Sequence, residues 1–328
     1  MPDLITHYHF YEVNRKDYKK EFEDVLKIAT QGPDPLFICD LGGYCHNTRA
    51  DINYEILMQI ADESEDKELY YTFIDGLFMH FALDSVAHPL IVSRAGYGYP
   101  EVGLDRLKFG HNNFETLLDY INARRYNLLL PNFWDIMLGV SDEHLEKLDK
   151  LWVEFNNRVT KFDNIGEHPF TVGVKHYIYG VKYSNLEPTK AYAKKILHRY
   201  GMYSKEYFIN MYRPIPKANA KLDILNNSHV EWEYPAYEGK STESFDDLFE
   251  KASKLYQQLH SLLLRRKEGQ DIKEELFKLM GQVDHCGTPF GKHIYKSTPI
   301  WKEGYNTFGE KIDDFEINPL YRREKIPF

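Results

Sequence analysis

The segment over residues 67–88 constrains this chain most, because it is long and apolar, and its apolar residues recur at helical spacing. A proline follows at position 89, and the residue before a proline disfavours helical geometry. The sequence therefore predicts a long helix that ends at His88-Pro89. Most other long segments carry the same helical spacing, and the strand–helix alternation that builds a parallel sheet is missing.

Helical periodicity predicts the other helices at 17–30, 52–64, 104–124, 142–161, 187–211, 243–267 and 271–281. Loops are expected where glycine, proline and polar residues gather, at 31–48, 94–103 and 214–241. Strand signals are weak and isolated, as in the β-branched alternation at 171–174. The pattern indicates an all-α, multi-helical protein.

The last segment, residues 284–328, differs from the rest of the chain. It has little helical period and several glycines and prolines, yet it holds eight aromatic residues. Disordered tails are poor in aromatic residues. We therefore expect a single helical domain over 1–283, with 284–328 as an irregular C-terminal extension that wraps over it and packs on it.

Composition excludes several classes of protein. The 328 residues are 43% hydrophobic and carry a net charge of −9, with no basic block, so we expect no stable nucleic-acid partner. No uninterrupted apolar run approaches the roughly 18 residues of a transmembrane segment, and the first residues do not resemble a secretory signal. Three cysteines without a CxxC pair favour a reducing compartment. A cytoplasmic location is the expectation.

Histidine and acid spacing carries the functional signal. His80, Asp84 and His88 are four residues apart in the apolar helix, so they share one stripe of its surface. His111 and Glu115 repeat the four-residue spacing in the next predicted helix. Imidazole nitrogens and carboxylate oxygens suit zinc or a similar divalent ion. Burying these groups without partners is costly, and a metal ion would satisfy them.

A simpler interpretation exists for both groups. His80 and His88 can be core histidines, with Asp84 hydrogen-bonded to one of them. His111 and Glu115 can be a polar pair on a surface helix. The adjacent His285 and Cys286, like the other remaining histidines, have no ligand-like spacing and receive no role from the sequence.

Several short motifs occur in an order that resembles the zinc-dependent phospholipase C family, in its branch without a signal peptide. They are T-H-Y at 6–8, Q-G-P-D-P-L-F at 31–37, G-Y-C-H at 43–46, H-F-A-L-D-S-V-A-H-P at 80–89 and H-N-N-F-E at 111–115. The resemblance covers about residues 1–125 and implies the helical fold shared by phospholipase C and the single-strand nucleases.

The resemblance also implies a cluster of two or three zinc ions among the helices, with iron or manganese as alternatives. One ion would take Asp34, His46, His80 and Asp84. A second would take His88, His111 and Glu115. A third would take His7, with Asp84 shared. Secreted members bind the third ion with an N-terminal tryptophan, whereas this chain begins MPDLI, so a two-ion site that includes His7 stays open.

The implied activity is hydrolysis of a phosphoester by in-line attack of metal-bound hydroxide on phosphorus. Asp34 would orient or deprotonate the water, which makes it the candidate catalytic residue as well as a ligand. The substrate would be a small phosphoester or a phospholipid. A single-strand nuclease or nucleotidase-like hydrolase and a non-catalytic metal-binding helical protein are the alternatives. HExxH, paired Glu-x-x-His and complete P-loop motifs are absent.

Overall fold

The computed structural model describes residues 4–16, 19–95, 114–115, 118–119, 121–123, 125–126, 138–184, 223–236 and 238–289. Over these residues the chain is mostly helical, which confirms the all-α prediction. The sheet found there is one antiparallel pair of two-residue strands, β1 (Trp232–Glu233) and β2 (Lys240–Ser241).

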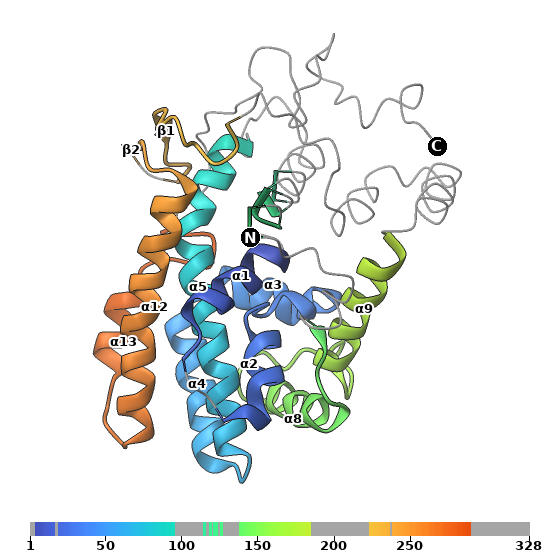
Figure 1. Ribbon diagram of the computed structural model, residues 1–328. Helices are drawn as coiled ribbons and strands as arrows, with labels where there is room; N and C mark the ends of the chain where they lie inside the picture. The colour runs from blue at the N-terminus through green and yellow to red at the C-terminus, as the bar shows by residue number, and fades with distance from the viewer. Residues whose placement is uncertain are drawn as a thin grey trace.

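The helices of the described residues follow in chain order (Figure 1): α1 (Leu4–Asn14), η1 (Lys20–Phe22), α2 (Glu23–Ala29), η2 (Asp34–Ile38), α3 (Asp40–Asn47), α4 (Ala50–Glu63), α5 (Lys67–Ala95), α8 (Asp142–Arg158), α9 (Pro169–Ser184), α12 (Phe245–Lys267) and α13 (Lys273–Met280). The predicted helices at 52–64, 142–161, 243–267 and 271–281 are confirmed as α4, α8, α12 and α13. The predicted helix at 187–211 and most of that at 104–124 lie outside the described residues.

Helix α5 is the central element, and α12, α2, α4 and α1 pack around it (Figure 1). Its aromatic and aliphatic side chains form the middle of the hydrophobic core. Among the described helices, α5 also has the length and composition of a membrane span, although acids at Asp75 and Asp84 interrupt its apolar run. Since 89% of that apolar window is buried inside the protein, α5 has the burial of a core helix.

The prediction that the long helix ends at His88 is wrong, because α5 continues through Pro89 to Ala95. Proline has no N–H, so the carbonyl four residues earlier, on Ser85, loses its partner in the helix. Gly287 of the C-terminal segment packs against this carbonyl with φ +66°, and a Cβ there would lie 2.2 Å from the Ser85 oxygen. The helix therefore continues past Pro89, and the C-terminal segment packs against the carbonyl that has lost its partner in the helix.

The expectation of a loop at 31–48 is wrong, and the weak signal at 171–174, from which no strand was predicted, has no counterpart in the fold. Residues 31–48 were expected to be a loop, but they contain η2 and α3. Residues 171–174 carried a weak strand signal, but they lie in α9, whose first amides, on Phe170 and Thr171, donate to Asp149 Oδ1 at 2.8 and 2.9 Å. Side chains from distant helices supply the caps and contacts here, and a local pattern does not contain them.

The C-terminal extension is described as far as residue 289. Asp284 Oδ1 accepts hydrogen bonds from the amides of Cys286 and Thr288, and a bridge joins Val283 to Pro289. This tight turn packs on α5 through Gly287. Residues 290–328 lie outside the described residues, so the wrapping of the rest of the extension and the domain division at 283 stay predictions.

A buried polar link joins α5 to α12. Asp75, fully buried on α5, accepts hydrogen bonds from the Tyr256 hydroxyl at 2.9 Å and from His260 Nδ1 at 3.0 Å. Burial, with the nearby carboxylate second, raises the pKa of Tyr256 far above its usual range, so the phenol stays a proton donor.

Replacing Asp75 with alanine should leave a buried hydroxyl and imidazole without their acceptor and lower the free energy of unfolding by about 2–4 kcal/mol. Urea denaturation measures this loss. The control is Glu63→Ala, which removes an exposed carboxylate paired with Arg158 and should have a much smaller effect. If both variants lost the same free energy of unfolding, the hydrogen bonds of Asp75 would contribute no more to stability than an exposed ion pair.

Candidate metal site

Helix α5 supplies the centre of the candidate site. His80 and Asp84 are fully buried, and His80 Nε2 lies 3.2 Å from Asp84 Oδ2 across one turn. The other ring nitrogen of His80, Nδ1, donates to the Thr30 carbonyl at 3.1 Å, which fixes the ring. Gly32, at φ +59°, lets the backbone pass against this ring, because a Cβ there would lie 2.3 Å from His80 Cδ2.

The segment over η2 and α3 brings Asp34 and His46 to the same place. Asp34 Oδ1 lies 2.9 Å from His46 Nε2 and 3.9 Å from His80 Nε2. His46 Nδ1 donates to the Gly42 carbonyl one helical turn earlier, at 2.7 Å. Both imidazoles therefore direct Nε2 toward the carboxylates and hold Nδ1 on the backbone.

Helix α1 adds His7, which contacts the second carboxylate oxygen of Asp84. His7 Nε2 lies 3.1 Å from Asp84 Oδ1, and its ring stacks on that of His80 with centroids 4.4 Å apart. The start of α1 is held by Asp119, whose carboxylate accepts from the amides of Ile5 and Thr6 at 2.7 and 2.8 Å. Asp119 is thus a positioning residue for His7.

The five side chains bring buried ligand atoms close to one another. Buried atoms without a hydrogen bond of normal geometry include Nε2 of three histidines and three carboxylate oxygens, on His7, His46, His80, Asp34 and Asp84. Two overlapping groups have ligand atoms within 4.8 Å of one another: His7, Asp34 and His80, and His46, His80 and Asp84. Such buried polar atoms are costly unless an ion or hydrogen bond satisfies them, so the residues fit a divalent metal ion.

Electrostatics favours the metal-binding forms of the imidazoles. Burial, followed by the charge of His80, lowers the pKa of His7 to about 4, and burial also lowers the pKa of His46. Both rings are therefore neutral near pH 7, as metal coordination requires.

The pKa values of the two carboxyl groups are shifted in opposite directions. Burial raises the pKa of Asp34 well above its usual range, with partial compensation from His80. Burial opposes ionisation of Asp84 too, but the charge of His80 and the close approach of the His7 and His80 rings to its carboxylate hold its pKa well below the usual range. A divalent cation would favour the ionised form of both groups.

The structure describes two of the three ligands predicted for the second ion, His88 and Glu115. His88 Nε2 lies 3.5 Å from Glu115 Oε1, and both side chains are nearly buried. The structure thus places the last histidine of the α5 stripe beside the predicted glutamate. His111 lies outside the described residues, so its membership of this set stays a prediction.

His285 lies beside the cluster, outside both groups of candidate ligands, and the sequence indicated no role for it. It is fully buried, and its ring centroid lies 5.0 Å from that of His46 and 5.7 Å from that of His80. Burial, with the charges of His46 and His80 next, lowers the pKa of His285 well below its usual range. No spacing pattern could have found it, because a distant turn brings it to the site.

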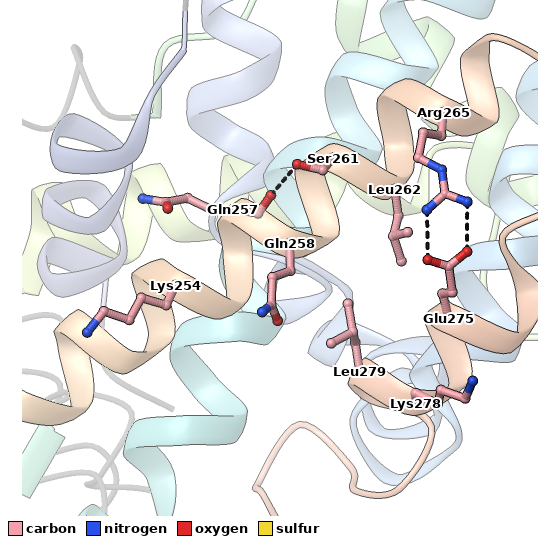
Figure 2. Close-up of a pocket in the computed structure, with 9 residues that line it drawn as sticks. All are labelled: Lys254, Gln257, Gln258, Ser261, Leu262, Arg265, Glu275, Lys278 and Leu279. Atoms are coloured by element: carbon pink, nitrogen blue, oxygen red, sulfur yellow. Dashed lines mark hydrogen bonds and ion pairs between the residues drawn. The ribbon is translucent and has the colours of Figure 1, made fainter.

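A separate surface groove lies between α12 and α13, with a volume of about 710 Å³ (Figure 2). Arg265, on α12, donates two hydrogen bonds of 2.7 Å to Glu275, on α13, and Figure 2 draws this pair as dashed lines. No candidate metal ligand lines this groove, so it is not part of the metal site.

No protein-family model matches the chain, and neither a search of curated proteins nor a search of solved structures finds a match. The likeness to zinc-dependent phospholipase C therefore rests on the motifs and on the side chains that the fold brings together.

Replacing Gly32 with alanine should displace the His80 ring and weaken zinc binding at least about tenfold, the scale seen when groups that orient a ligand are disturbed. Isothermal titration with Zn²⁺ measures the affinity. The matched control is Gly166→Ala, because Gly166 has a similar φ of +71° but open space at its Cβ position. Both variants carry the strain of a left-handed alanine. Equal zinc affinities would contradict the placement of His80 in the site.

Proposed function

We propose that this protein is a metal-dependent phosphoester hydrolase of the phospholipase C type, with zinc as the first metal to test and iron or manganese as alternatives. One observation carries the proposal: five buried side chains from α1, η2, α3 and α5 bring histidine and aspartate ligand atoms together without hydrogen bonds. A fold that only needed stability would fill this volume with apolar side chains.

The number of ligands supports a catalytic role over a purely structural one. Each of the two groups offers three protein ligands, and structural zinc sites are normally closed by four. His80 is common to both groups, and one imidazole nitrogen binds one ion. The carboxylates of Asp34 and Asp84 can bridge, so the five residues are able to hold two ions with coordination positions left for water and substrate.

Divalent ions held here would activate water and stabilise negative charge on a phosphoryl group. The chain's own contribution is orientation. Asp34 is 4% exposed and lies beside His46 and His80, and in this proposal it accepts a proton from the attacking water. His88, on the same stripe of α5, and Glu115, from a later segment, add a second imidazole–carboxylate pair.

Phe37 supports a substrate with a flat or apolar group. Its side chain is 52% exposed and stacks on His46, with ring centroids 4.6 Å apart. An exposed aromatic ring beside a phosphoester site can stack on a nucleobase, so a single-strand nuclease or nucleotidase-like activity is the second enzyme candidate. A phospholipid or a small phosphoester remains the first candidate substrate.

The near-complete burial of the ligands favours a different alternative, a metal-binding helical protein without hydrolase activity. His7, His80 and Asp84 are at most 1% exposed. Elemental analysis of the purified full chain, together with a panel of phosphodiesters, phosphomonoesters, single-stranded DNA and phosphatidylcholine vesicles, distinguishes these candidates.

We expect two or more ions per chain and turnover of at least one phosphoester. Asp84→Asn should lower both the metal content and the rate, because it removes an anionic ligand that faces His7 and His80. The control is Asp75→Asn, an equally buried carboxylate on the same helix that faces Tyr256 and His260, which should retain the metal. Metal without turnover would favour the non-catalytic protein, and unchanged metal in Asp84→Asn would remove that residue from the site.

A further inference from the structure

The last turn of helix α3 carries His46 and depends on contacts from other segments. The helix has only eight residues, Asp40–Asn47, and a helix of this length is not stable by itself in water. Its last four carbonyls have no partner inside the helix. The Thr48 hydroxyl donates to the first of these, on Tyr44, at 2.7 Å. The carbonyls of Cys45 and His46 need partners from elsewhere.

His285, from the other end of the described chain, meets both of these carbonyls. Its amide donates to the His46 carbonyl at 3.4 Å. Its ring is fully buried, which lowers the pKa of His285, and an interaction with the Cys45 carbonyl partly offsets this shift. One residue therefore covers the end of α3 twice, with its backbone and with its side chain.

The ring of His285 is itself anchored to α4 and α5. Its Nε2 lies 3.0 Å from the hydroxyl of Tyr54 on α4, and this hydroxyl lies 3.3 Å from the Leu77 carbonyl on α5. The ring also packs at a right angle to that of Phe81 on α5, with centroids 5.3 Å apart. Since Nε2 faces Tyr54, Nδ1 is the nitrogen left for the Cys45 carbonyl.

The turn over residues 283–289 is fixed to α5. Asp284 Oδ1 accepts hydrogen bonds from two amides of the turn, at 2.8 and 2.9 Å. Gly287 has φ +66°, and a Cβ there would lie 2.2 Å from the Ser85 oxygen of α5. The turn therefore holds His285, and through it the end of α3, against the helix at the centre of the metal site.

These contacts determine where His46 lies. Its Nδ1 donates to the Gly42 carbonyl within α3, so the ring moves with the helix. Its Nε2 lies 2.9 Å from Asp34 Oδ1, and its ring packs beside that of His285, with centroids 5.0 Å apart. A metal ligand has to be held within about 0.5 Å of its productive position. A short helix with an uncovered end does not meet this requirement.

We infer that His285 is a positioning residue of the metal site: it covers the C-terminal end of α3 and holds His46 in place without binding the metal ion itself. His285 belongs to neither group of ligand atoms that lie within 4.8 Å of one another. The inference rests on the metal binding of the proposed function. It gives a role in that site to the 283–289 turn, which the phospholipase C motifs do not include.

The test compares His285→Asn with His285→Leu in the full chain, because the two new side chains have nearly the same shape. The asparagine amide can still donate to the Cys45 carbonyl, whereas leucine makes no hydrogen bond. Isothermal titration with Zn²⁺ should show an affinity about 10–100-fold lower in His285→Leu, the scale expected when a group that orients a ligand is lost. His285→Asn should keep most of the wild-type affinity.

A spectroscopic readout separates positioning from ligation. In protein saturated with Co²⁺, each ligating histidine contributes an exchangeable ring N–H signal with a large paramagnetic shift. The number of these signals should be the same in the wild type and in both His285 variants. One signal should move in His285→Leu, because the His46 ring is displaced.

Gly287→Ala tests the turn without changing the His285 side chain. It should also weaken zinc binding, because the added Cβ meets the Ser85 oxygen. The matched control is Gly269→Ala, since Gly269 has a φ of +86° but open space at its Cβ position.

Three results would overturn the inference and leave the proposed function standing. They are wild-type zinc affinity in His285→Leu, equal affinities in the two glycine variants, and the loss of one N–H signal in both His285 variants, which would make His285 a ligand. Failure of the wild-type chain to bind either ion would overturn both the inference and the proposed function.

Discussion

The burial of an imidazole and a carboxylate in the middle of the central helix is the constraint on which this structure depends. His80 and Asp84 face each other on α5 without exposure to water. Polar atoms in such a place need partners of matching chemistry. The surrounding segments provide more imidazoles and carboxylates, which a divalent cation would satisfy together. The α-helical core is thus organised around a polar centre.

The elements around this centre are each fixed by a polar contact from far along the chain. Asp119 holds the start of α1, and Asp149 holds the start of α9. Helix α9 packs on η2, where a Cβ at Gly173 would lie 2.0 Å from the Pro35 carbonyl. These close contacts place Asp34 and His7 by the packing of helices. The positions of the ligands are therefore a property of the tertiary fold.

Much of the fold could be predicted from periodicity, and the errors have a common cause. The amphipathic helices α4, α8, α12 and α13 carry their own helical signal. The break expected at Pro89 and the loop expected around Asp34 are wrong because distant residues compensate for unfavourable local sequence. For the site, the four-residue spacing of His80, Asp84 and His88 was visible directly. His7, Asp34 and His46 were visible only through family-like motifs.

The sequence alone determined that the chain is helical and that one stripe of its most apolar helix carries imidazole and carboxylate groups, since both follow from side-chain spacing along a regular helix. Tertiary structure alone decided which other side chains meet that stripe. His285 shows the difference: it lies 205 residues from His80 in the chain, and a turn seated on the Ser85 carbonyl places its ring 5.7 Å from that histidine. No local pattern encodes such a contact, because it depends on the packing of the whole chain.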